Sequence, residues 1–94
     1  MLNYSVYNIQ FKKHPIEKWI VVSGEIHNET SKSYNTAVFH LKIFVGQDCL
    51  GATLIKLRGL RGKSSKNFEV LVEGVHYELL NKVMRCEIFF ESAY

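Results

Sequence analysis

Residues 19–28 read Trp-Ile-Val-Val-Ser-Gly-Glu-Ile-His-Asn, and this segment is the clearest indication of the fold class. Apolar side chains or glycine occupy every second position from Ile20 to Ile26. Serine, glutamate and histidine stand between them in the second half of the stretch. Successive side chains of a β-strand point to opposite faces of its sheet. The alternation therefore predicts a strand with one face in the core and the other in water.

The same period of two recurs along most of the chain. It predicts further half-buried strands at residues 36–46, 66–73 and 83–91. Residues 4–12 are rich in β-branched and aromatic residues and predict an opening strand, and residues 49–57 read as a strand weakened by a glycine. Six strands at near-regular spacing predict an antiparallel sandwich or a small barrel.

Turn-forming residues separate the predicted strands. Lys-His-Pro at residues 13–15 ends the first strand, because proline cannot donate a hydrogen bond to a neighbouring strand. Residues 28–33, 46–48 and 58–62 are rich in glycine, serine, asparagine and aspartate and predict the later connections. Residues 74–82 fit either a short helical turn or a loop.

Length and composition limit the chain to one small domain, predicted at residues 1–94. Apolar residues make up 47% and charged residues 22%, which is typical of a globular protein. The longest apolar runs fall far short of the roughly 20 residues that span a bilayer. The first ten residues lack a basic segment followed by an apolar one, so a cytoplasmic location is the expectation. If the chain is a fragment of a longer precursor, the expected location is extracytoplasmic.

Asn28 and Gly24 suit particular structural tasks. The Asn28 side chain is expected to fold onto the backbone two residues further on and to start the turn. Asn28-Glu29-Thr30 also has the form of a glycosylation site, but without a signal peptide we interpret it as turn chemistry. Gly24 lies on the core face, where the missing side chain admits a close neighbour.

A series of short motifs extends from about Trp19 to Phe90. Its members are Gly24, Ile26, Asn28, Thr30, Tyr34, Leu50, Gly51 and Phe68. In this order they resemble the FxLYD domain family. Residues 41–45 stand where the motif that names the family would be, with hydrophobic substitutes and with Val45 in place of the aspartate. The resemblance implies an immunoglobulin-like β-sandwich of about six or seven strands, an accessory or interaction module without catalytic residues. Such modules are often attached to lipoprotein or membrane segments outside the cytoplasm.

The histidines allow a comparison of two interpretations. We expect residues 19–28 and 36–46 to form a hairpin, which would place Glu25 roughly opposite His40 and bring His27 close by. A surface metal site is one interpretation of this group, and a solvated glutamate–histidine pair is the favoured one. Structural zinc sites use four ligands at close spacing, which the chain does not offer. No cofactor and no metal are expected.

The two cysteines are expected to differ in burial. Cys86 shares its strand face with Met84, Ile88 and Phe90, so it should be a small buried hydrophobic side chain. Cys49 begins a strand beside a turn and is expected to be exposed. A disulfide between them requires that their strands face each other at suitable geometry. We expect free thiols.

Two sets of residues are candidates for binding. The alternation assigns three large apolar side chains to solvent-facing positions, where they would form a patch for a protein partner or a homodimer: Phe44, Leu71 and Phe89. Five cations with no acid among them form a candidate anion site: Lys56, Arg58, Arg61, Lys63 and Lys66. A solvated loop is the simpler interpretation of these cations, and single-stranded nucleic acid is the ligand they would recruit.

Catalytic motifs are not apparent in the sequence. There is no nucleophile elbow, no glycine-rich phosphate loop and no pair of carboxylates set by spacing. The sequence therefore predicts a non-enzymatic accessory or protein-interaction module, which self-associates if the outward aromatic side chains meet a second copy. The alternative is a small basic β-domain that binds single-stranded nucleic acid through residues 56–66.

Overall fold

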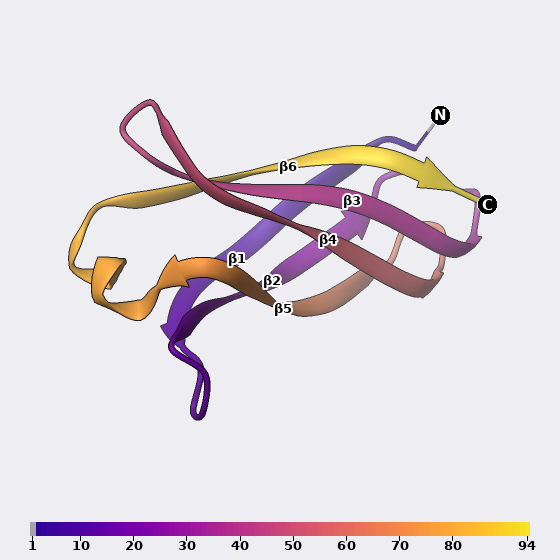
Figure 1. Ribbon diagram of the computed structural model, residues 1–94. Coiled ribbons are helices and arrows are strands. Elements are labelled where there is room, and N and C mark those ends of the chain that lie inside the picture. Colours follow the sequence, from indigo (N-terminus) through magenta and orange to yellow (C-terminus); the bar gives the residue numbers. More distant parts are fainter. Residues whose placement is uncertain (1) are drawn as a thin grey trace.

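Six long strands carry the predicted alternation (Figure 1). The computed structural model describes residues 2–94, so the first residue of the predicted domain lies outside the described range. Its elements are β1 (Tyr4–Lys13), β2 (Trp19–Asn28), β3 (Tyr34–Val45), β4 (Asp48–Leu60), β5 (Ser65–His76), the 3₁₀ helix η1 (Tyr77–Asn81) and β6 (Met84–Ala93). Every predicted strand is present, and residues 58–60, predicted as part of a turn, continue β4.

The strands form two three-stranded sheets that pack against each other (Figure 1). One sheet has the order β1-β2-β5 and the other has the order β4-β3-β6. All neighbouring strands run antiparallel. The prediction of an all-β antiparallel sandwich is confirmed.

The core lies between the two sheets and takes one face from each strand. Its fully buried side chains include Ile20, Val22 and Ile26 of β2 and Phe39, Leu41 and Ile43 of β3. Burying a side chain of this size stabilises the fold by about 1.5–3 kcal/mol. Tyr4 of β1 closes one side, because its ring packs edge-on against Phe39 at 5.0 Å and its hydroxyl donates to the Ile88 carbonyl at 2.8 Å.

The predicted hairpin between β2 and β3 is wrong. The two strands lie in different sheets, so Glu25 pairs with Tyr7 and Asn67 and is not opposite His40. His27 lies in the β1-β2-β5 sheet, away from His40. The connection after β2 crosses from one sheet to the other instead of reversing within one sheet, and the predicted His–Glu–His group does not form.

Asn28 organises this crossover, as predicted from its turn chemistry. Its side chain is fully buried, and its Oδ1 accepts from the Thr30 backbone N–H at 2.9 Å and from the Thr30 hydroxyl at 2.6 Å. Its Nδ2 donates to the Lys32 carbonyl at 2.8 Å. All of the side chain's polar atoms are thus partnered within the turn, which directs the chain towards β3.

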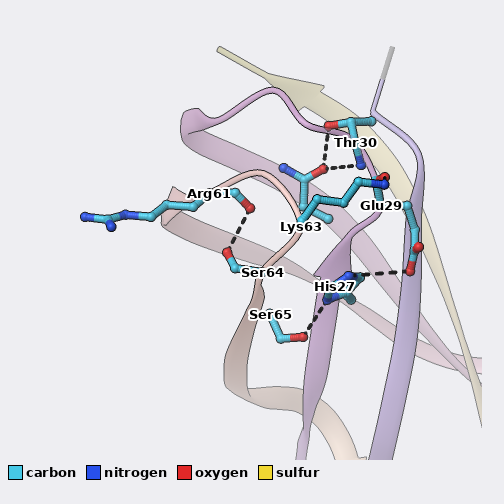
Figure 2. A network of polar contacts seen from close by, with 8 residues as sticks. His27, Glu29, Thr30, Arg61, Lys63, Ser64 and Ser65 are labelled. Atoms are coloured by element: carbon cyan, nitrogen blue, oxygen red, sulfur yellow. Dashed lines mark hydrogen bonds and ion pairs between the residues drawn. The ribbon is translucent and has the colours of Figure 1, made fainter.

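A second loop packs against the crossover and joins β4 to β5 (Figure 2). The Lys63 N–H donates to the Thr30 carbonyl at 2.9 Å, and the Asn28 N–H donates to the Ser64 carbonyl at 2.9 Å. The Gly62 N–H donates to the Ser33 hydroxyl at 3.1 Å. These bonds hold the two inter-sheet connections together at one end of the sandwich.

A bulge in β1 explains the glycine on the core face of β2. Tyr7 and Gln10 pair with residues on β2 that flank Gly24, so two residues of β1 stand opposite one of β2. Asn8 adopts φ 57° within this bulge. A Cβ at Gly24 would lie 2.7 Å from the tip of Ile9, which confirms the predicted close approach.

The ambiguous segment before the last strand contains the short helix η1. The His76 side chain accepts from the Glu78 N–H at 3.1 Å and so caps this helix. Among residues 2–94 no helix has both the length and the apolar character needed to cross a membrane.

Candidate interaction surface

The outer face of the β4-β3-β6 sheet carries a row of three side chains, one from each strand. His40 on β3 pairs with Leu54 on β4 and with Phe89 on β6. Leu54 is 53% exposed and Phe89 is 44% exposed. We call Leu54, His40 and Phe89 the central row. Two large apolar side chains therefore face solvent on either side of a histidine.

Cations lie over the aromatic rings of this face. The Arg85 guanidinium lies 4.5 Å from the centroid of the Phe44 ring, and the Lys42 ammonium lies 5.6 Å from that of Phe89. Contacts of this kind stabilise exposed side chains by about 0.5–1 kcal/mol. Arg85 also pairs with Glu87, the next outward side chain on β6. The face thus combines apolar contact area with fixed charges.

His40 is oriented by an acid from the neighbouring strand. Its Nε2 lies 2.5 Å from Oε1 of Glu91 on β6, in a position where both side chains are partly exposed. A bulge in β6 brings Glu91 next to the central row. The sequence predicted a glutamate–histidine pair at His40, but the glutamate is Glu91 and not Glu25.

Charge is unevenly distributed over the face. On β4, Lys56 and Arg58 follow the central row, and neither has an ion-pair partner within residues 2–94. On β6, Glu87 and Glu91 lie on either side of the row. Beyond them Tyr94, which is 69% exposed, exchanges backbone hydrogen bonds with β3. One edge strand is therefore basic beside the row, and the other is acidic.

The structure separates the three predicted apolar residues. Phe44 and Phe89 share the outer face of β4-β3-β6. Leu71 is on β5, opposite Val21, on the outer face of the other sheet. There it lines a cavity of about 470 Å³ with His14 and neighbouring side chains. The predicted single patch therefore does not form. Alternation predicts the face of the strand on which a residue lies, but it does not predict the sheet to which the strand belongs.

The five predicted cations are also divided. Lys56 and Arg58 lie on the outer face of β4 beside the central row. The Lys63 ammonium donates to the Glu29 carbonyl, and Arg61 points away from that network (Figure 2). Lys66 belongs to β5 in the other sheet. These residues do not converge on one anion site, but two of them share a face with Phe44 and Phe89.

Leu54 escaped prediction because β4 does not alternate regularly. The pairing of β3 with β4 shifts between Ile43 and Phe44, so Leu50 is an additional residue on β4. Because of this shift, Cys49 and Leu54 share a face although they are five positions apart along the strand. A signal is still present after the bulge, because Ile55 and Leu57 alternate with Lys56 and Arg58, and the same period places Leu54 on the side of the two cations.

The cysteines flank β3 and are both free. Cys86 pairs with Ile43, and Cys49 pairs with Phe44 on the opposite side of β3. Cys49 is exposed, whereas Cys86 is partly buried, and this burial raises the pKa of its thiol. Within residues 2–94 no three histidine, cysteine or acidic side chains are close enough to hold a metal ion.

We expect a thiol reagent to distinguish the two cysteines. At pH 8 a disulfide reagent such as Ellman's should modify Cys49 first, because the reactive species is the thiolate and burial disfavours it at Cys86. Stopped-flow absorbance should show a fast and a slow phase, and Cys49→Ser should remove the fast one. Loss of the slow phase instead would contradict the assigned burial.

Comparison with known proteins adds no relative to this description. No model of a known protein family matches the chain, and no curated protein is similar to it. The functional argument therefore depends on the geometry of the surface.

Proposed function

We propose that this chain is a non-catalytic interaction module that binds a protein partner through the outer face of β4-β3-β6. The observation that carries the proposal is the central row, in which Leu54 and Phe89 are both about half exposed on one face of the sheet. Exposed apolar side chains with polar residues around them are typical of protein contact surfaces. His40 and Glu91 form a polar pair beside these two apolar side chains.

The proposed fold family is the immunoglobulin-like sandwich, with FxLYD domains as the predicted relatives. The sheet orders β1-β2-β5 and β4-β3-β6 correspond to the A-B-E and C′-C-F strands of that arrangement. The Asn28 turn supports the resemblance because it gives the glycine–asparagine–threonine motif a structural role. A cytoplasmic location stays a prediction from the sequence.

Substitution of Phe89 by lysine should abolish most partner binding. The change removes one of the two exposed apolar side chains of the central row and adds a desolvation cost, so we expect at least a tenfold loss of affinity. The measurement is quantitative capture from an extract of the native cells, with each variant's folding verified by its thermal melting. Equal capture by the wild type and Phe89→Lys would reject the surface.

Ile16→Lys is the matched control for this experiment. Ile16 is 88% exposed in the connection between β1 and β2, away from the β4-β3-β6 sheet. The substitution makes the same change of charge and also removes an exposed apolar side chain. Capture should therefore remain at the wild-type level in Ile16→Lys.

Single-stranded nucleic acid is the second candidate ligand, since cations and aromatic rings share this face. Lys56 and Arg58 lie on the same face as Phe44 and Phe89, an arrangement that would allow bases to stack while the phosphates are neutralised. Fluorescence anisotropy with a labelled oligonucleotide tests this candidate. Binding that weakens steeply with salt and is lost in Arg58→Glu would favour it over a protein partner.

A further inference from the structure

The outer face of β4-β3-β6 is complementary to a copy of itself. Its central row ends in an apolar side chain on both sides, Leu54 on β4 and Phe89 on β6. One step beyond the row, β4 carries Lys56 while β6 carries Glu91. The face therefore has an apolar side chain at each end of the row and, one step beyond the row, a cation on one edge strand and a carboxylate on the other.

A twofold axis along β3 makes use of this arrangement. Turning a second copy about this axis places its β6 over β4 of the first copy, at the same height along the strands. Leu54 then faces the partner's Phe89, and Lys56 faces the partner's Glu91. Arg58 faces the partner's Tyr94, because both residues lie beside Thr36 of β3 and are therefore at the same height along the strands. A contact of this type is isologous, so each pair occurs twice.

The other twofold axis in the plane of the face is unfavourable. An axis across the strands through His40 would place β6 over β6 of the partner. Glu87 would then lie near the partner's Glu91, because these residues flank Phe89 on the same strand. Like charges facing each other oppose association. The axis along β3 also brings Lys42 towards its own copy, but this like-charge contact occurs once, whereas the attraction between Lys56 and Glu91 occurs twice. The axis across the strands has the Glu87–Glu91 repulsion twice, so charge favours the axis along β3.

We infer that the partner bound by this face is a second copy of the chain, joined face to face about a twofold axis along β3. The inference rests on the proposed function, because it uses the same surface. Three strands about 4.8 Å apart and about ten residues long present a face of roughly 500 Å². Stable dimers bury about 800 Å² per partner, so this dimer should be weak and dependent on concentration.

A charge exchange tests the pairing. Sedimentation equilibrium between about 10 µM and 1 mM should show reversible dimerisation of the wild type. Lys56→Glu and Glu91→Lys should each weaken the dimer about tenfold, because each places like charges together twice. The double variant restores opposite charges and should recover most of the wild-type association.

The control for this exchange lies on the other sheet. Lys66→Glu and Glu73→Lys alter the net charge by the same amounts as the test variants, but both residues are on β5. Neither control should change the dissociation constant more than about twofold, which corresponds to the usual scatter of distant substitutions.

The outcomes distinguish this inference from the proposed function. If the wild type remained monomeric over the whole concentration range, the inference that the partner is a second copy would be rejected. The capture experiment with Phe89→Lys would still test whether this surface binds another protein. A dimer that is lost in Phe89→Lys but insensitive to the charge exchange would retain the surface and overturn the twofold axis. A dimer unaffected by Phe89→Lys would overturn both. A monomer that binds a labelled oligonucleotide in a salt-dependent manner would replace the second copy with nucleic acid.

Discussion

Asn28→Ala is expected to lower the free energy of unfolding by about 3 kcal/mol, because it removes a fully buried side chain together with the three hydrogen bonds that it makes within the turn. The Asn28 side chain is fully buried and bonds to the Thr30 N–H, the Thr30 hydroxyl and the Lys32 carbonyl. A domain of this size is stabilised by only about 5–15 kcal/mol in total. The substitution should therefore shift the urea midpoint by a large fraction of its value.

Asn35→Ala provides the matched control for Asn28. Asn35 is exposed at the beginning of β3, and its recorded hydrogen bond to Tyr94 uses the backbone N–H. The same chemical change there should cost less than about 0.5 kcal/mol, as is usual for surface positions. Urea unfolding followed by tryptophan fluorescence compares the two variants. Equal losses of stability would show that the buried turn contributes nothing particular to the fold.

Gly62→Ala is expected to destabilise the chain by about 3 kcal/mol, at the upper end of the usual cost of overpacking. A Cβ at Gly62 would lie 2.4 Å from the carbonyl oxygen of Ser31 and 2.5 Å from its carbonyl carbon. These are backbone atoms and cannot rotate away. The loops could separate only by stretching the bond from the Lys63 N–H to the Thr30 carbonyl and the bond from the Gly62 N–H to the Ser33 hydroxyl.

Gly46→Ala is the control that distinguishes a steric clash from backbone strain as the cause of destabilisation. Gly46 has φ 61° in the turn between β3 and β4, and a Cβ there would meet nothing within 4 Å. Its substitution should cost about 1 kcal/mol, the usual cost of placing a side chain in the left-handed region. Gly62 is not among the glycines with positive φ, so its cost arises from contact alone. If Gly46→Ala proved the more harmful of the two, this explanation would be rejected.

Both predictions concern the same part of the molecule. Asn28 ends β2, and the loop around Gly62 leads from β4 into β5, so each belongs to a connection between the two sheets. The Asn28 N–H donates to the Ser64 carbonyl, which links the two connections directly. Substitutions at this end of the sandwich should therefore weaken the packing of one sheet against the other, but not the hydrogen bonding between strands within either sheet.

The candidate surface was partly predictable from the sequence. Alternation placed Phe44 and Phe89 outward, and the structure puts both on the outer face of β4-β3-β6. It could not exclude Leu71, because that side chain is outward on a strand of the other sheet. It could not include Leu54, because a bulge shifts the alternation within β4. The pairing of His40 with Glu91 depends on a second bulge, in β6.

The strands, their buried faces and the Asn28 turn could all be predicted from the amino-acid sequence. These depend on neighbours along the chain: a period of two assigns a side chain to one face, and an asparagine side chain reaches backbone two residues away. Which strands share a sheet, and hence which outward residues meet, depends on the folded arrangement of the whole chain. The apolar face of a strand is buried equally well in either sheet of the sandwich. The alternation of its residues is therefore the same whichever strand lies next to it. The choice is made by contacts far apart in the chain, such as the Ser31 backbone against Gly62, and by bulges that shift the register.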